Sequence, residues 1–130
     1  SYALFPHMTV EQNIAFGLRR KARAEIERRV LEVSKKIGIA SLLDRFPHTL
    51  SGGEQQRVAV ARALINDPKV VLADEPSGNL DSDAARELHQ LFFQLRKQFN
   101  QTFIIVTHNT ELADLADRKL TMKDGTIAQH

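Results

Sequence analysis

Cysteine is absent from this chain of 130 residues, which excludes disulfide bonds and thiolate metal sites. Glycine and proline are few, at six and four residues, while hydrophobic residues make up 42% of the chain. This composition is that of a globular protein and argues against a disordered chain. The length corresponds to about one domain with a single core.

The net charge does not indicate a nucleic-acid partner, and the apolar runs do not indicate a membrane-spanning segment. The 18 Lys and Arg residues exceed the 16 Asp and Glu residues by two, a surplus too small to imply a nucleic-acid partner. The longest strand-like apolar runs, residues 70–73 and 103–106, have four residues each. A membrane-spanning helix needs about 20. We therefore predict a soluble chain with no nucleic-acid partner, and any membrane role would require a partner protein.

Helical spacing of apolar residues dominates the first half of the chain. From Ile26 to Ile37 they recur at i, i+4, i+7 and i+11, which predicts a helix of about 16 residues ending at Gly38. Residues 19–36 hold eight Lys and Arg against three Glu. We interpret them as the solvated side of an amphipathic helix, with a phosphate or acidic lipid surface as the alternative partner. A second helix is predicted over about residues 53–65.

Two short apolar runs flank a helix in the second half. Residues 70–73 and 103–106 are predicted to be buried strands. Between them, residues 85–99 place apolar side chains on one face of a helix. A short helix near residues 110–116 and a hairpin turning at residues 124–125 follow. The strand–helix–strand order predicts a parallel α/β sheet.

Two adjacent carboxylates, Asp74 and Glu75, directly follow the first predicted strand. Ligands of open α/β sheets lie beyond the carboxyl ends of the strands. Acids at such a position are costly to desolvate unless they meet a cation or take part in proton transfer. Mg2+ held through Asp74, with Glu75 orienting or deprotonating a water, would suit phosphoryl transfer. An ordinary exit from strand to loop is the alternative.

A glycine pair opens the second predicted helix, within residues 50–57, which read LSGGEQQR. Gly52 and Gly53 let the backbone come close to a ligand, and the N–H groups of the helix N-terminus face it. The helix dipole favours an anion such as phosphate, and Ser51 adds a hydroxyl donor. A serine N-cap followed by a glycine-rich turn is the simpler interpretation.

Four ordered segments together resemble the ABC-type ATPases. Residues 50–57 resemble the signature motif of that family, and residues 70–75 resemble its Walker B strand with the catalytic glutamate. Residues 77–81 are similar to its D-loop, and residues 107–108 to its switch histidine. The opening residues 2–10 look like the segment that follows its Q-loop, so the resemblance extends over essentially the whole chain.

The resemblance implies a P-loop NTPase-like α/β fold with a parallel-sheet core. Residues 1–66 would form a helical subdomain that carries the signature motif. Residues 67–130 would form the Walker B, D-loop and switch part of the ATPase core. No Gly-x-x-x-x-Gly-Lys phosphate loop is present in the sequence. We therefore expect an incomplete core, the C-terminal portion of a nucleotide-binding subunit that does not hydrolyse ATP by itself.

The resemblance also implies roles for individual residues, with ATP and Mg2+ as cofactors. Asp74 would help to hold Mg2+ through water. Glu75 would be the general base that polarises the attacking water. His108 would contact the γ-phosphate and link it to Glu75.

A second subunit would complete the site, because nucleotide domains of this family close head-to-tail over two ATPs. The γ-phosphate held by that subunit would be bound in trans by Ser51, Gly52, Gly53 and Glu54. Asp81 would make contacts across the interface. The other histidines show no metal-ligand spacing and are interpreted as surface or packing residues; they are His7, His48, His89 and His130.

The implied parent protein is the ATP-hydrolysing subunit of a membrane transporter, bound to transmembrane permease subunits on the cytoplasmic face of the cell membrane. Residues 77–81 and 119–122 resemble exporters of the lipoprotein-releasing and macrolide-export type, whereas residues 2–18 look like solute importers. Substrate and direction of transport therefore stay open. One alternative is a non-catalytic module that keeps the signature motif as a dimer contact. Chromosome-maintenance ATPases are disfavoured, because only about 49 residues precede the signature motif and none sustains heptads.

Overall fold

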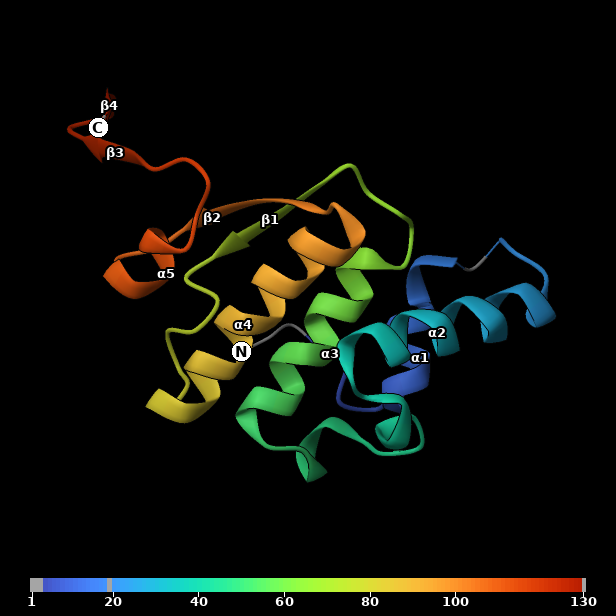
Figure 1. Ribbon diagram of the computed structural model, residues 1–130. Helices are drawn as coiled ribbons and strands as arrows, with labels where there is room; N and C mark the ends of the chain where they lie inside the picture. Colours follow the sequence, from blue (N-terminus) through green and yellow to red (C-terminus); the bar gives the residue numbers. More distant parts are fainter. Residues whose placement is uncertain (1–3, 19, 130) are drawn as a thin grey trace.

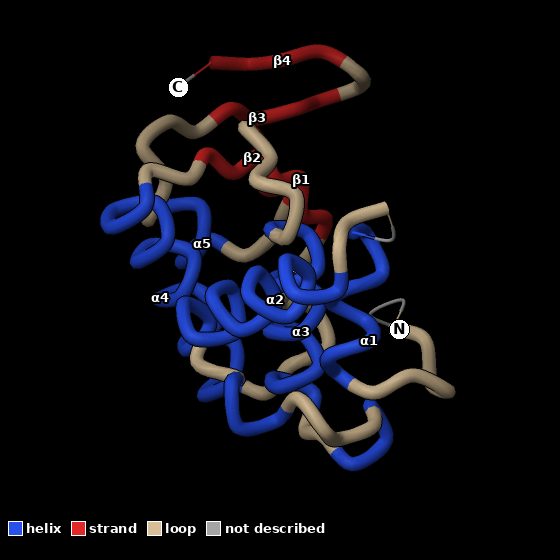
Figure 2. Tube along the Cα trace, turned by 90° about the vertical axis from the view of Figure 1, so that its right-hand side faces the viewer, coloured by secondary structure: helices blue, strands red, loops and turns tan. Residues whose placement is uncertain are grey.

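Helices and a small parallel sheet lie side by side in the computed structural model, which describes residues 4–18 and 20–129 (Figure 1). The helices α1, α2 and α3 form one group, and α4 lies between α3 and the strands β1 and β2. The hairpin of β3 and β4 lies beyond the sheet, on the side away from α1 (Figure 2). Parts of two predictions, the opening segment and His130, lie outside the described residues.

Capping residues mark one end of each of the first three α-helices. Helix α1 (Val10–Ala15) begins with a capping box between Thr9 and Gln12. Helix α2 (Arg23–Ile37) ends at Gly38, whose φ of 80° is the left-handed conformation that glycine adopts without strain. Helix α3 (Gly52–Leu64) begins at the N-cap Ser51. The predicted helices for α2 and α3 are confirmed within one or two residues, while α1 was not predicted.

The sheet core consists of β1 (Val70–Asp74), α4 (Ser82–Phe99) and β2 (Thr102–Val106). The two strands are parallel, and the register pairs Val70 with Thr102 and Asp74 with Val106. Both strands therefore end together, at the edge that carries Asp74. This confirms the predicted strand–helix–strand unit with a parallel pair.

The chain closes with α5 (Thr110–Asp114) and an antiparallel hairpin of β3 (Leu120–Lys123) and β4 (Thr126–Gln129). Its turn residues Asp124 and Gly125 both have positive φ, as the Asp-Gly pair predicts. Three short 3-10 segments connect the helices of the first half: Phe16–Leu18, Ala40–Leu42 and Pro47–Thr49.

Burial of the two parallel strands is the prediction that the structure corrects. On one face Val71 is buried, and the Phe103 ring lies 5.0 Å from the Phe92 ring of α4. On the other face Leu72 is 75% and Val106 61% exposed. Side chains alternate between the two faces of a strand, and in the described residues α4 packs against only one of them. The apolar run therefore predicts the strand correctly, but not what covers it.

One hydrophobic core runs through both parts of the chain, with α3 at its centre. Fully buried core residues come from α1, α2, α3 and α4, among them Val30, Val58 and Leu88. The predicted division between residues 66 and 67 falls between α3 and β1 and stays a prediction. Among the described helices, none is both long and apolar enough to span a membrane.

Candidate functional site

Glu75 stands directly after β1 in an unusual backbone conformation. Its φ is 45°, a left-handed value that costs a residue other than glycine on the order of 1–3 kcal/mol. Two hydrogen bonds hold this conformation. The Glu75 N–H donates to the carbonyl of Val106 at 2.7 Å, and the Gly78 N–H donates to the Glu75 carbonyl at 3.1 Å. The surrounding structure thus maintains a strained turn at this carboxylate.

The Glu75 carboxylate is oriented by the end of β2. The Thr107 hydroxyl donates to its Oε2 at 3.3 Å, and the His108 backbone N–H donates to its Oε1 at 2.7 Å. The Asn109 N–H in turn donates to the Thr107 hydroxyl oxygen at 2.9 Å, which leaves the hydroxyl proton for Glu75. Parallel pairing of β1 and β2 therefore brings together groups that are 32 and 33 residues apart in the sequence.

His108 meets Glu75 through its backbone rather than through its ring. The imidazole Nε2 lies 3.9 Å from Glu75 Oε1, longer than a hydrogen bond, and the His108 side chain is fully exposed. The structure thus brings the predicted pair together, with the ring free to contact a ligand. Thr107 has a side-chain contact to Glu75 that sequence reasoning missed; its position beside His108 at the end of a strand was the available signal.

Asp74, the predicted Mg2+ residue, is exposed at the carboxyl end of β1. The Glu75 side chain is 38% exposed, so this structure leaves both adjacent acids in contact with water and avoids the cost of full desolvation. Within residues 4–18 and 20–129, no group of three or more His, Cys, Asp or Glu could hold a metal ion. A lone exposed carboxylate fits Mg2+, because this ion usually keeps several waters and takes one or two carboxylates together with phosphate oxygens.

The signature-like segment forms the N-terminus of α3. The Ser51 hydroxyl accepts from the Glu54 N–H at 3.1 Å, and the Glu54 carboxylate accepts from the Ser51 N–H at 2.9 Å. This reciprocal capping box makes Ser51 the N-cap of α3. It leaves the serine hydroxyl proton for a ligand. The N–H groups of Gly52 and Gly53, at the first two helical positions, have no acceptor within the helix.

The starts of α3 and α4 are neighbours. A Cβ placed on Gly53 would lie 3.4 Å from the Cβ of Ala84. Asp81 is the N-cap of α4, and its carboxylate accepts from the Ala84 N–H at 2.8 Å. The Gln56 side-chain amide donates to the carbonyl of Pro76, in the turn that follows Glu75.

The predicted site residues therefore form two groups. Glu75 and His108 meet at the strand ends, next to Asp74. Ser51 to Glu54 lie at the start of α3, and Asp81 at the start of α4. In the part of the chain that the structure describes, no hydrogen bond or ion pair joins residues 51–54 to Glu75, Thr107 or His108.

The histidines that were predicted to be surface or packing residues differ in their burial. His7 and His48 are exposed, and His89 is buried in α4.

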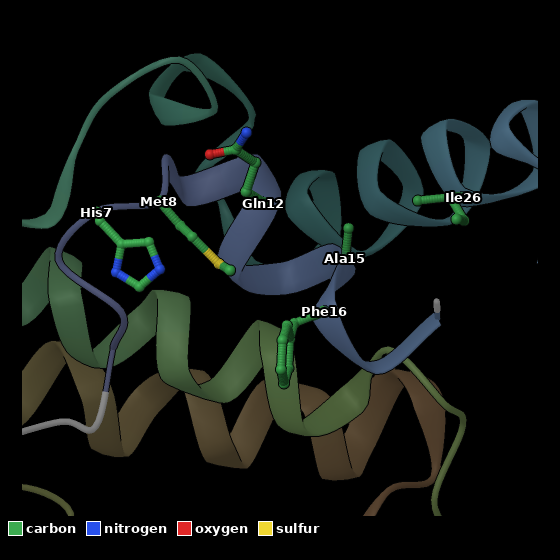
Figure 3. Close-up of a pocket in the computed structure, with 6 residues that line it drawn as sticks. All are labelled: His7, Met8, Gln12, Ala15, Phe16 and Ile26. Carbon is green, nitrogen blue, oxygen red and sulfur yellow. The ribbon is translucent and has the colours of Figure 1, made fainter. Parts of the chain in front are cut away.

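A separate groove of about 420 Å³ lies beside α1. Figure 3 shows its lining side chains: His7, Met8, Gln12, Ala15, Phe16 and Ile26. The loop before α1 is shaped by the buried Asn13, whose side-chain oxygen accepts from the Phe5 N–H at 2.8 Å. Its amide nitrogen contacts the carbonyls of Phe5, Met8 and Thr9 at 3.0–3.2 Å. Sequence reasoning did not identify Asn13.

Comparison with curated proteins shows clear relatives. The chain is 54% identical over 126 residues to the lipoprotein-releasing system ATP-binding protein LolD of Cytophaga hutchinsonii, covering 95% of this chain and 58% of the relative. It is 49% identical over 132 residues to the spermidine/putrescine import ATP-binding protein PotA of Aliivibrio fischeri, covering 99% of this chain and 36% of the relative. The chain thus spans 58% of the length of the first relative and 36% of the second.

Solved structures show the same fold. The dimeric structure of MJ0796, a bacterial ABC transporter cassette, matches with a TM-score of 0.81 and 34% identity, over 98% of this chain and 58% of that one. The cbiO1 protein of Clostridium perfringens, part of the ABC transporter complex cbiONQ, matches with a TM-score of 0.89 and 34% identity. That match covers 97% of this chain and 51% of cbiO1. These likenesses confirm the predicted ABC ATPase cassette fold.

The family model for ABC transporters matches residues 1–78, well over half of the chain. This match agrees with the signature-like helix, with the strand that ends at Asp74 and is followed by Glu75, and with the relatives described above. The chain belongs to the ABC transporter family and is related to its ATP-binding subunits, including those of lipoprotein-releasing systems.

Proposed function

We propose that these residues are part of the ATP-hydrolysing subunit of an ABC transporter, with Glu75 as the general base. The observation that carries this proposal is the Glu75 carboxylate, held by Thr107 and by the His108 N–H at the common end of β1 and β2. A general base needs a fixed orientation and a lone pair within reach of the proton that it takes. Two of about four lone-pair positions on the carboxylate are used, and the side chain remains partly exposed.

In the proposed reaction, Glu75 accepts a proton from a water that attacks the γ-phosphorus of ATP. The new bond joins the water oxygen to phosphorus, and the bond from phosphorus to the bridging oxygen of ADP breaks. Thr107 and the His108 N–H keep the carboxylate from turning away from this water. The exposed His108 ring is placed to donate a hydrogen bond to the γ-phosphate.

Asp74 would hold Mg2+ through a water ligand, next to Glu75 on the same strand end. When bound, Mg2+ neutralises charge on the phosphate oxygens. The contribution of the chain is an exposed carboxylate at the edge of the sheet, where ligands of α/β folds bind.

The start of α3 would bind the γ-phosphate of an ATP that is held by a second nucleotide-binding subunit. The residues involved would be Ser51, Gly52, Gly53 and Glu54. Two observations support an action in trans. No hydrogen bond or ion pair joins these residues to Glu75, Thr107 or His108 within the described part of the chain, and the related MJ0796 cassette is dimeric. The unused N–H groups at the start of α3 and the helix dipole suit a phosphate anion. Asp81, at the neighbouring start of α4, would lie at the dimer interface.

The groove beside α1 would receive a transmembrane permease subunit, which places the protein on the cytoplasmic face of the membrane. Its lining combines the apolar side chains of Met8, Phe16 and Ile26 with the polar Gln12 (Figure 3). Such a surface suits an apolar segment with a few polar groups. The transported substrate stays open, because the relatives are named for lipoprotein release and for spermidine/putrescine import.

The test is Glu75→Gln in the full-length natural protein. We expect kcat for ATP hydrolysis to fall about 10²- to 10⁴-fold, since the base is lost, while the Kd for ATP changes less than about twofold. Glu87→Gln, on the exposed surface of α4, is the matched control and should keep the wild-type kcat. Unchanged turnover in the Glu75 variant would refute the assignment of the base. A wild-type protein that binds ATP without hydrolysing it would instead favour a non-catalytic module.

A further inference from the structure

A buried hydrogen bond joins the turn after Glu75 to the middle of α4. The Ser77 hydroxyl and His89 Nε2 are 2.9 Å apart, and the residues are only 8% and 3% exposed. They are two of the four buried polar residues in the described chain. Buried polar groups of this kind stabilise one arrangement, because any other leaves both partners without a hydrogen bond.

Ser77 lies inside the turn that sets the backbone of Glu75. The Gly78 N–H closes this turn on the Glu75 carbonyl at 3.1 Å, and a Cβ on Gly78 would lie 3.3 Å from that carbonyl oxygen. The turn is therefore tight as well as strained, with Glu75 at a φ of 45°. A shift of Ser77 would move the Glu75 backbone and reorient its carboxylate.

Two helices hold this turn by side-chain hydrogen bonds. Gln56 of α3 donates to the carbonyl of Pro76, and His89 of α4 bonds to the hydroxyl of Ser77. The carboxylate of Glu75 is held separately, by Thr107 and His108. Of the two contacts made by the helices, the His89 contact is between two side chains, so it can be removed without changing a backbone group.

We infer that His89 is a positioning residue for ATP hydrolysis, which acts through Ser77 to hold the turn at which the Glu75 carboxylate meets Thr107 and His108. This inference rests on the proposed role of Glu75 as the base. His89 touches neither the substrate nor the reacting atoms. It stabilises the turn that carries Glu75, whose carboxylate acts on the attacking water.

The protonation state of His89 is compatible with this role. Burial lowers the pKa of His89, and the nearby Glu111 carboxylate partly opposes that shift. The neutral ring therefore predominates near neutral pH. Its Nε2 can accept the Ser77 proton in one tautomer or donate its own in the other, so both tautomers satisfy the bond.

The experiment compares Ser77→Ala, His89→Phe, His89→Gln and the Ser77→Ala/His89→Phe double variant in the full-length natural protein. Steady-state ATP hydrolysis and thermal unfolding are measured for each. Ser34→Ala is the matched control, because Ser34 is also buried but its hydroxyl has no hydrogen-bond partner in the described structure.

We expect Ser77→Ala and His89→Phe each to lower kcat about tenfold, which equals about 1.4 kcal/mol at the transition state. The KM for ATP should stay within about twofold. The double variant should be no slower than either single one, as expected for partners in one bond. His89→Gln should recover at least half of the wild-type kcat, because its amide can still bond to Ser77. Ser34→Ala should keep the wild-type kcat.

Several results would overturn the inference. One is a wild-type kcat for Ser77→Ala, whether or not the unfolding temperature falls. His89 would then contribute to packing but not to catalysis. A second is additive loss in the double variant, and a third is failure of His89→Gln to recover kcat. If His89→Phe does not fold, Ser77→Ala and His89→Gln decide. Glu75→Gln separates this from the proposed function: if it hydrolyses ATP normally, the base assignment fails whatever the His89 variants do.

Discussion

Replacing Ser51 by aspartate separates the two tasks assigned to this residue, capping α3 and binding phosphate. The Ser51 hydroxyl accepts the Glu54 N–H at 3.1 Å, and aspartate is as good an acceptor at an N-cap as serine. Ser51→Asp should therefore keep the free energy of unfolding within about 0.5 kcal/mol of wild type. Ser51→Ala removes the acceptor and should cost about 1 kcal/mol, or about 3 °C in Tm.

The effect of Ser51→Asp on ATP should be far larger than its effect on folding. A carboxylate about 4 Å from a phosphate charge is repelled by about 4 kcal/mol per unit charge at an effective dielectric constant of 20. That energy corresponds to about a 10³-fold loss in kcat/KM. Ser51→Ala loses one hydrogen bond to a charged group, about 1.5–3 kcal/mol, and should fall less.

The assay is ATP hydrolysis together with thermal unfolding in the full-length natural protein. Thr9→Asp is the matched control, because Thr9 forms the same type of capping box with Gln12 at the start of α1. It places an identical charge at a helix start where no phosphate is proposed, so hydrolysis should stay at the wild-type rate. A Ser51→Asp protein with wild-type kcat/KM would refute the phosphate role. One that unfolds as early as Ser51→Ala would refute the capping argument.

Two further predictions concern stability. Gly38 has a φ of 80° after α2, so Gly38→Ala should lower the free energy of unfolding by about 1 kcal/mol, measured with denaturant. Gly38→Asn should lower it less, since asparagine tolerates this conformation better. Equal losses in the two variants would count against the backbone explanation. Burial lowers the pKa of His89 below its ordinary value of 6.5. As the pH falls, the imidazole is therefore protonated in the unfolded chain before it is protonated in the folded chain. The stability due to the neutral ring is complete above pH 6.5 and declines as the pH falls toward the lower pKa of the folded state. Unfolding of His89→Phe is followed from about pH 7.5 to about pH 5, a range of about 2.5 units around the ordinary pKa. The decline in stability should be weaker than in wild type, and identical slopes would contradict this origin.

Local signals predicted most of the elements. Helix α2 followed from the apolar spacing between Ile26 and Ile37 and from Gly38, because each of these acts within one helix. The hairpin followed from Asp124 and Gly125. Helix α1 has only six residues, too few for a periodic pattern. Its available signal was the pair Thr9 and Gln12, the spacing of a capping box.

The burial of individual side chains and their partners in distant segments were not predicted from the sequence. The apolar run at residues 70–73 predicted a buried strand, yet Leu72 is exposed, because a run of apolar residues does not say what covers each face. His89 was interpreted as a surface or packing residue; its partner Ser77 is 12 residues away and belongs to a loop. No spacing rule connects two such residues.

The sequence by itself determined the family, most of the elements and the candidate site residues, because these depend on residue types and on spacing along one segment. The tertiary structure decided which groups meet. Glu75 reaches Thr107 and His108 only because β1 and β2 pair in parallel and end at the same edge. The same folding places His89 on Ser77 and the start of α3 beside the start of α4. These contacts join distant segments through space, so they arise from packing and strand register rather than from any local pattern.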